Sequence, residues 1–179
     1  WESFQIRTNM RSLLVANYKY LAQAVVLLSG NKISIIDYKL ARKEVYIASA
    51  NMGSTFQRLL TEPKWRQKHT KEVNRFVILN HILSSYTASL LTQIYNSEND
   101  FANSEHLKLL LKTLGHLEGA IQDISTNTYA DVEFIKTATR NNIELINDDS
   151  ILIAEQLQFL SKISGDLQKI VSSLASKEI

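Results

Sequence analysis

The feature that most constrains the fold of this chain is how rarely an element can be interrupted. One proline and five glycines occur in 179 residues, and these two residue types are the strongest local breakers of helices and strands. An all-β sandwich needs a turn about every 8–12 residues, which is far more turns than this composition provides. The sequence therefore predicts long, nearly continuous elements that bury a core, since 45% of the residues are hydrophobic.

Apolar residues recur at alternating steps of three and four, which places them on one face of an α-helix. This spacing predicts helices over about 4–28, 34–61, 64–95, 104–124 and, after a cap at 148–150, up to about 175. Gly30 suits a left-handed helix end, Ser34 with Asp37 suits a helix start, and Pro63 disfavours helical geometry in the residue before it. The pattern weakens over 129–147, where we expect a short irregular or helical segment.

Helices of about 25 residues are roughly 38 Å long, so we expect them to lie side by side. The connections 29–32 and 62–64 are short, and short connections make consecutive helices antiparallel neighbours. We predict an all-α fold: an antiparallel up-and-down bundle of four to five long helices, in a single domain over residues 1–179. The longest nearly apolar run, residues 20–28, is too short to cross a bilayer, which needs roughly 20 apolar residues.

Several polar and small residues interrupt the apolar stripes. An unpaired buried amide costs about 1–3 kcal/mol, so we expect Asn17, Asn51, Asn80 and Thr87 to find partners and fix helix register, or else to line a polar pocket. Gly115 and Gly119 lie four residues apart on one helix face. They predict a close approach of another helix, with a ligand crevice as the alternative.

The residues that carry catalysis or metal binding are scarce. The chain has no cysteine, which excludes a disulfide, a thiolate zinc site and a cysteine nucleophile. The four histidines, His69, His81, His106 and His116, do not occur in a metal-binding spacing. No glycine-rich phosphate loop is present either. We therefore predict a protein that is not an enzyme and that uses no metal and no cofactor.

Charge is divided unevenly along the chain, although the net charge is only +2. Residues 1–90 carry 13 Lys and Arg against 5 Asp and Glu, whereas residues 91–179 carry 7 against 13. This division indicates either that one side of the molecule faces an anionic partner or that the two halves attract each other.

The densest cluster of positive charge surrounds a tryptophan. Its residues are Lys64, Trp65, Arg66, Lys68, Lys71 and Arg75. Such a group can sit on anionic lipid headgroups or face a protein partner, while the simpler alternative is a solvated helix end. We do not expect nucleic acid as a partner, because the second half is acidic and no helix-turn-helix pattern is visible.

Several strings in the first half of the chain resemble the C-terminal cytoplasmic region of YccS-type proteins, which belong to the fusaric-acid-resistance-like, or aromatic acid exporter-like, membrane family. The strings are Trp1-Glu2, Leu14-x-Ala16-Asn17-x-x-Tyr20-Leu21, Leu40-Ala41-Arg42-Lys43-Glu44-x-Tyr46-x-Ala48-x-Ala50-Asn51, Phe56-Gln57-Arg58-Leu59-Leu60-x-Glu62-Pro63 and Arg75-Phe76-x-x-Leu79-Asn80-His81-x-Leu83. The resemblance fades after about Leu91. It assigns no role to its motif residues, which include Trp1, Glu2, Asn17, Arg42, Tyr46, Arg58, Glu62 and Pro63.

The resemblance implies that this chain is a piece of a longer bacterial inner-membrane protein and lies on the cytoplasmic side of that membrane. In the family, the Trp-Glu motif follows a block of transmembrane helices. The implied partners are that transmembrane region, an anionic lipid surface and further copies of the chain. The implied function is a non-catalytic structural, assembly or regulatory domain of a transporter or efflux protein.

A second function comes from a different class: a stand-alone helical module or regulator that holds a small organic acid or a protein partner. Arg42 or Arg58 would bind the carboxylate of an acid. The two arginines lie sixteen residues apart on one predicted helix, about 24 Å, so they cannot hold one small ligand together. We expect each otherwise to form an ion pair, with Glu44, Glu62 or an acidic residue of the second half.

Overall fold

The computed structural model describes residues 2–65, 67–96, 104–125 and 148–176, and within these residues it contains helices and no strand. The helices are α1 (Glu2–Leu28), α2 (Ile35–Thr61), α3 (Thr70–Asn96), α4 (Ser104–Ile124) and α5 (Asp148–Ala175). The predicted all-α bundle of long helices is confirmed. The predicted irregular or helical segment at 129–147 lies outside the described residues.

The turn between α1 and α2 forms as the sequence predicts. Gly30 has a φ of 75°, which is the left-handed region that glycine enters without steric cost. Its N–H donates to the carbonyl of Leu27 at 3.0 Å, and the N–H of Asn31 donates to the carbonyl of Val26 at 3.1 Å. Ser34 then begins α2, because its hydroxyl accepts a hydrogen bond from the backbone N–H of Ile36 at 3.3 Å.

The start of α3 differs from the prediction. The helix begins at Thr70 and not near Lys64, so Lys64, Trp65 and Lys68 lie in the connection before it. The cause is a left-handed backbone at His69, whose φ is 55°. The carbonyl of His69 then accepts the first helical hydrogen bond, from Val73 at 3.0 Å.

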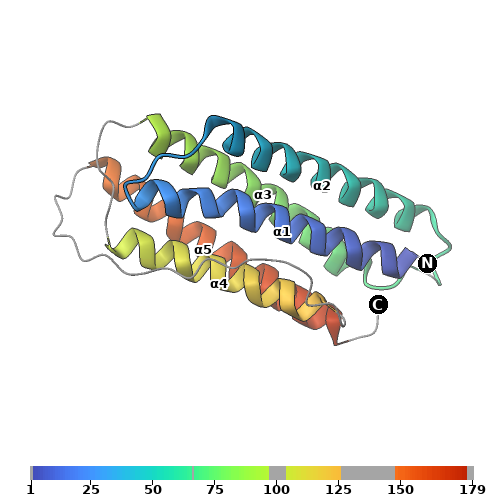
Figure 1. Ribbon diagram of the computed structural model, residues 1–179. Coiled ribbons are helices and arrows are strands. Elements are labelled where there is room, and N and C mark those ends of the chain that lie inside the picture. The colour runs from blue at the N-terminus through green and yellow to red at the C-terminus, as the bar shows by residue number, and fades with distance from the viewer. Residues whose placement is uncertain (1, 66, 97–103, 126–147, 177–179) are drawn as a thin grey trace.

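In the described residues, α1, α3, α4 and α5 form a closed ring, and α2 lies outside it. In the ring, α1 contacts α4, α4 contacts α5, α5 contacts α3, and α3 contacts α1. Within the described residues, α2 contacts α1 and α3 and no other helix. Figure 1 shows α2 along the outer edge of the bundle, away from α4 and α5. The result is a four-helix bundle with one helix added over the contact between α1 and α3.

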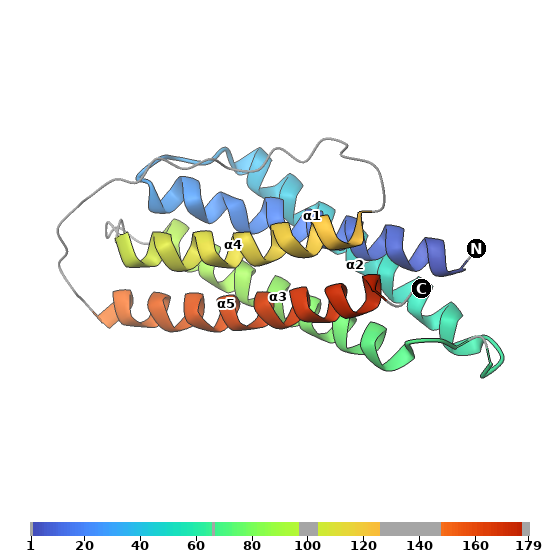
Figure 2. The same ribbon diagram turned by 90° about the horizontal axis from the view of Figure 1, so that it is seen from below.

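Helix direction alternates from α1 to α4, but α5 runs in the same direction as α4 (Figure 2). Side-chain contacts follow this parallel register: His116 donates to Gln168 at 3.0 Å, and Ser172 donates to Asp123 further along both helices. The end of α4 and the start of α5 accordingly lie at opposite ends of the bundle. Short connections are expected to make consecutive helices antiparallel. The two short connections, between α1 and α2 and between α2 and α3, do join antiparallel helices.

Buried residues from all five helices form one continuous hydrophobic core. A polar contact joins α1 to α3 inside it: the Asn17 amide donates to Asn80 Oδ1 at 3.1 Å, and Ser84 donates to Asn17 Oδ1 at 2.8 Å. The partners predicted for Asn17 and Asn80 are thus confirmed, and Asn51 is exposed. The prediction is wrong for Thr87, whose buried hydroxyl has no hydrogen-bond partner in the described residues. Because the two asparagines pair in only one register, they fix how far α1 slides along α3.

The glycine pair of α4 divides into two different cases. A methyl group on Gly119 would overlap the side-chain amide of Gln168 on α5, so this glycine marks the predicted close approach. Gly115 has open space around it. Only at Gly119 would a side chain therefore have to displace a neighbour, and that neighbour is the flexible end of Gln168.

Candidate functional site

The connection between α2 and α3 is a turn held by its own hydrogen bonds. The side-chain amide of Gln67 donates to the carbonyls of Leu60 at 2.9 Å and Glu62 at 2.6 Å, at the C-terminal end of α2. Its backbone N–H donates to the carbonyl of Lys64 at 3.3 Å, and the Thr70 hydroxyl donates to the Gln67 carbonyl at 3.1 Å. Gln67 therefore ties the end of α2 to the start of α3 and leaves Lys64 and Trp65 at the tip.

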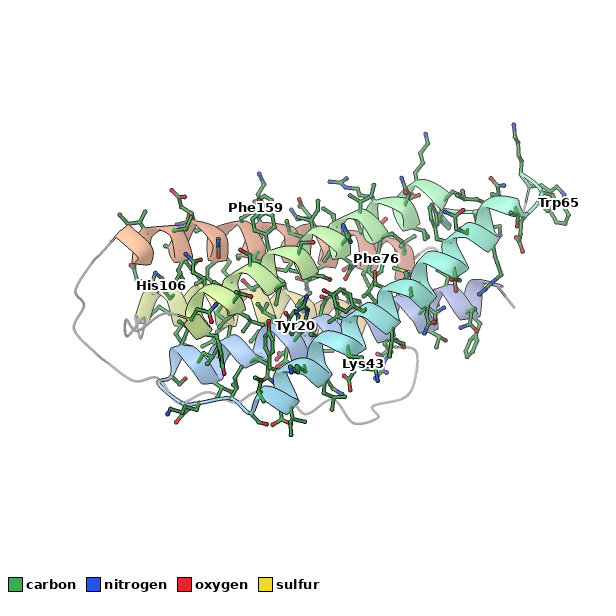
Figure 3. The ribbon with its side chains drawn as sticks, turned by 90° about the horizontal axis from the view of Figure 1, so that it is seen from above. Tyr20, Lys43, Trp65, Phe76, His106 and Phe159 are labelled. Carbon is green, nitrogen blue, oxygen red and sulfur yellow. The ribbon has the colours of Figure 1, made fainter. Side chains whose placement is uncertain are left out.

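Positive side chains and a tryptophan gather at this turn, and we call this group the basic end. It consists of Lys64, Trp65, Lys68, Lys71 and Arg75. All five are exposed, and Trp65 is 73% exposed. Figure 3 shows Trp65 at the outermost point of the molecule, beyond the end of α2. The sixth predicted residue of this cluster, Arg66, lies outside the described residues.

The basic end lies at the same end of the bundle as the start of α1 and the end of α5 (Figure 1). Phe4, in the first turns of α1, is 74% exposed. Beside Lys71 and Arg75, a surface hollow of about 360 Å³ opens between α3 and α5, and Asp166 lines its other side. Asp166 itself accepts a hydrogen bond from Lys169 at 3.4 Å. The hollow is also lined by Glu72, so its three basic side chains exceed its two carboxylates by a single charge.

A second feature is a cleft over α3, bounded by α2 on one side and α5 on the other. We call it the α2–α5 cleft; its volume is about 490 Å³. Figure 3 shows α3 running between these two helices. The cleft exists because α2 and α5 do not touch and because α3 presents small side chains between them. The lining residues are Tyr38, Arg42, Ala88, Ser89, Thr92, Gln93, Leu152 and Gln156.

Two acceptors in the cleft wall lack partners. The side-chain oxygens of Gln93 on α3 and Gln156 on α5 are buried and receive no hydrogen bond in the described part of the chain. A buried acceptor without a donor costs about 1–3 kcal/mol. Gln93 and Gln156 both line the cleft, but these two oxygens are enclosed by the protein and do not open into it.

Arg42 faces the cleft from α2. Its Nε donates to the Tyr46 hydroxyl at 3.1 Å, and its guanidinium lies 5.4 Å from the centre of that ring. This hydrogen bond raises the pKa of Arg42 above its usual value. No carboxylate pairs with Arg42 among the residues that the structure describes, so its remaining N–H groups are available to an anion.

Three tyrosines connect the cleft wall to the core. The rings of Tyr38 and Tyr95 are stacked with centroids 6.4 Å apart, and those of Tyr20 and Tyr38 are 5.9 Å apart. The Tyr20 hydroxyl donates to the Tyr38 hydroxyl at 3.5 Å. Burial, followed by this hydrogen bond, raises the pKa of Tyr20 above its usual value. Tyr20 therefore stays neutral and supports Tyr38, which itself lines the cleft.

The motif residues of the family resemblance do not form one site. Asn17 is in the core, Arg42 and Tyr46 pair with each other on α2, and Glu62 and Pro63 follow its C-terminus. Arg58 donates to the Thr55 hydroxyl at 3.0 Å, which also accepts from Asn9 at 2.6 Å. The side chains of Trp1 and Glu2 lie outside the described residues.

Two expectations were stated for Arg42 and Arg58: that each forms an ion pair, and that they lie too far apart to hold one ligand. The ion pairs expected for Arg42 and Arg58 are wrong, because a tyrosine and a threonine hydroxyl are their partners in the described structure. Their separation is confirmed, because α2 is one continuous helix over both positions. Only Arg42 lies at a cleft.

Sequence reasoning missed the α2–α5 cleft. Gln93 and Gln156 fall beside the apolar stripes of their helices, which is a weak signal of a polar site. No pattern in the chain says that α5 packs on α3 opposite α2, so the two glutamines could not be paired in advance. A tertiary contact creates this cleft.

Neither a metal-binding cluster nor a membrane-spanning helix is found among the described residues. No group of three or more histidine, aspartate or glutamate side chains is close enough there to hold a metal ion. None of the described helices combines the length and the hydropathy needed to cross a bilayer. In comparisons with protein-family models, curated proteins and solved structures, nothing matches this chain.

Proposed function

We propose that this chain is a non-catalytic helical domain of a fusaric-acid-resistance-type inner-membrane protein, and that its basic end faces the anionic cytoplasmic surface of the membrane. The domain would act in structure, assembly or regulation of that transporter. The observation that carries the proposal is the position of the basic end. It lies at the same end of the bundle as the start of α1, which the family resemblance connects to the transmembrane region.

The chemistry of the basic end fits a membrane surface. Each basic residue near an anionic leaflet contributes about 1 kcal/mol, and the end offers four of them in Lys64, Lys68, Lys71 and Arg75. Tryptophan is enriched at the boundary between lipid and water, because its ring is apolar and its N–H is polar. The exposed ring of Trp65 projects beyond these charges, as such an anchor requires.

The local structure keeps these side chains outside the core. The side chain of Gln67 satisfies the carbonyls at the end of α2, and the side chains of Lys64, Lys68 and Lys71 are exposed. Replacing these three lysines by glutamine should therefore leave the fold intact. This independence makes the proposal testable with charge variants.

The test is co-sedimentation with phosphatidylcholine vesicles prepared with and without phosphatidylglycerol. The variant K64Q/K68Q/K71Q removes three charges from the basic end, and K39Q/K43Q/K112Q removes three exposed charges elsewhere. We expect the native chain and the control variant to bind phosphatidylglycerol vesicles at low salt and to be released by added salt. The basic-end variant should stay in the supernatant. Equal binding by both variants, or no binding by the native chain, would refute the proposal.

A second candidate function is the binding of a small organic acid. The structure favours Arg42 over Arg58 for this role, because Arg42 lines the α2–α5 cleft and has no carboxylate partner in the described residues. Arg58 instead belongs to the polar contact between α1 and α2. A thermal-shift titration with a short carboxylate tests this function, and R42Q should abolish the shift while R58Q keeps it.

A further inference from the structure

We infer that the surface hollow between α3 and α5 binds the headgroup of one phosphatidylglycerol molecule, which is a singly charged phosphodiester with two hydroxyl groups. The inference rests on the proposed function and deepens it, because it names the lipid that is selected and the place where its headgroup is held. Its basis is that the hollow combines basic side chains with carboxylates and lies at the end of the bundle that carries the basic end.

The position of the hollow suits a headgroup. Its residues lie in the first two turns of α3, which begins at Thr70, and in the last three turns of α5, which ends at Ala175. The two helices are neighbours in the ring. The volume of about 360 Å³ falls within the range of small-molecule sites. A headgroup at the membrane surface can therefore enter the hollow without any insertion of the domain into the bilayer.

The phosphate would be held by basic side chains from both helices. Lys71 and Arg75 are four residues apart on α3, so their side chains share one face; both are exposed and have no acidic partner in the described residues. The Lys169 side chain on α5 is 80% exposed and has only a long contact of 3.4 Å with Asp166. Packed helices lie about 8–10 Å apart, and lysine and arginine have long stems, so these cations can reach one phosphate from both walls.

The carboxylates of the hollow restrict which phosphate fits. With Glu72 and Asp166 included, the lining side chains carry a net charge of +1, which matches the single negative charge of a phosphodiester. A free phosphate ester carries about −1.5 to −2 at pH 7 and would be repelled by both carboxylates. Phosphatidylethanolamine has no net charge, so a positive hollow favours it less.

The same carboxylates give the headgroup hydroxyls a role. An ionised carboxylate only accepts hydrogen bonds, and the two hydroxyls of the glycerol headgroup are donors. These hydroxyls lie on the second and third carbons beyond the phosphate, so they can reach a carboxylate that lies beside the phosphate-binding cations. Asp166 lines the hollow together with those cations. The hollow should therefore prefer phosphatidylglycerol over a lipid of equal charge without hydroxyls.

The test measures binding of the whole chain to phosphatidylcholine vesicles that contain the same fraction of phosphatidylglycerol, phosphatidylmethanol or phosphatidylethanolamine. Phosphatidylmethanol has the charge of phosphatidylglycerol but no headgroup hydroxyl. We expect phosphatidylglycerol vesicles to bind about three- to tenfold more tightly than phosphatidylmethanol vesicles, the factor for about one net hydrogen bond. Phosphatidylethanolamine vesicles should bind least. Glycerol 3-phosphate should displace the chain no more than sodium chloride of equal ionic strength does.

Variants test whether the hollow is the site. Asp166→Ala removes a negative charge, so attraction by charge alone should strengthen binding to both anionic lipids. In a headgroup site the preference for phosphatidylglycerol over phosphatidylmethanol should instead fall to about one. Lys169→Gln should weaken phosphatidylglycerol binding about threefold or more relative to Lys162→Gln, which removes an equal charge from an exposed position of α5 outside the hollow. Circular dichroism of each variant checks that the helices are intact.

The outcomes separate this inference from the proposed function. If the native chain binds phosphatidylglycerol and phosphatidylmethanol vesicles equally, the membrane-facing function stands and the headgroup site is wrong. If it binds neither, both are wrong. A preference that survives Asp166→Ala and Lys169→Gln would show that the hollow is not the site. Equal binding of phosphatidylethanolamine, or displacement by glycerol 3-phosphate beyond the salt control, would also overturn the inference.

Discussion

The two sides of this bundle differ in how their apolar residues are used. On α5, eight apolar side chains from Ile153 to Leu174 are buried against α3 and α4. On α2, Ile36, Leu40, Tyr46 and Ile47 are at least half exposed, although the helix is almost as long. The contact between α4 and α5 is therefore built for stability, whereas α2 uses one face for packing and leaves the other open.

Both candidate sites involve α2. The basic end follows its C-terminus, and the α2–α5 cleft lies along its N-terminal half. Each depends on α2 standing apart from α4 and α5. This comparison teaches that the closed ring of α1, α3, α4 and α5 serves as a scaffold and that the candidate binding surfaces lie beside the added helix, where it meets that ring.

The largest expected effect is a difference in the free energy of unfolding. Shortening a buried side chain of the scaffold should lower it far more than shortening an exposed side chain of α2. Leu157→Ala removes a side chain that is 0% exposed and should lower the free energy of unfolding by about 2–5 kcal/mol. Leu40→Ala removes one that is 52% exposed and should change it by about 0.5 kcal/mol or less. Urea unfolding measures both, and equal losses would show that α2 belongs to the scaffold.

The asparagine pair inside the core gives the next effect. Asn17→Leu leaves Asn80 without its donor and should cost about 1–3 kcal/mol. The double variant N17L/N80L should recover most of that loss, because both unpaired groups are then gone. A double-mutant cycle by chemical denaturation measures the coupling, and additive losses would mean that the two amides do not depend on each other.

The glycines of α4 provide a matched pair with a smaller effect. Gly115→Ala points into open space and should raise the free energy of unfolding by up to about 1 kcal/mol through helix propensity. Gly119→Ala displaces the Gln168 amide and breaks its hydrogen bond with His116, which should offset that gain. The two melting temperatures test this, and equal stabilisation by both changes would contradict the close contact between α4 and α5.

The smallest effect concerns Tyr20. Because folding raises its pKa, the unfolded chain ionises first, above about pH 10. Stability from this residue is complete below that pH and is lost as the pH rises further, by at most about 1.4 kcal/mol per pH unit. Comparing the native chain with Tyr20→Phe by urea unfolding at mildly and strongly alkaline pH measures it. The phenylalanine variant should lose less stability, and an equal loss would show that another group causes the alkaline destabilisation.

The sequence predicts the helices of this fold well and their arrangement only in part. Gly30 and Ser34 act through local backbone chemistry, so the helix end at Gly30 and the helix start at Ser34 could be predicted from the sequence. The apolar stripe of α5 could be predicted in the same way. The start of α3 could not, because the left-handed backbone at His69 has no strong sequence signal. The parallel packing of α4 and α5 depends on a longer connection, for which no simple rule fixes the direction.

The candidate sites divide in the same way. The basic end was predictable because its residues are adjacent in sequence, although its turn was expected to be helical. The hydrogen-bond partner of Arg42 could not be predicted, because a tyrosine one turn along α2 takes the place of the expected carboxylate. The α2–α5 cleft combines residues from three helices, and only the packed structure brings them together.

The central claim is that the basic end meets an anionic membrane surface, and the emission of Trp65 tests it most directly. In the variant Trp1→Phe, Trp65 is the only tryptophan. Adding phosphatidylglycerol vesicles should shift its emission to shorter wavelength as the ring leaves water, and added salt should reverse the shift. An emission maximum that stays unchanged with vesicles present, while circular dichroism shows the helices intact, would contradict the account.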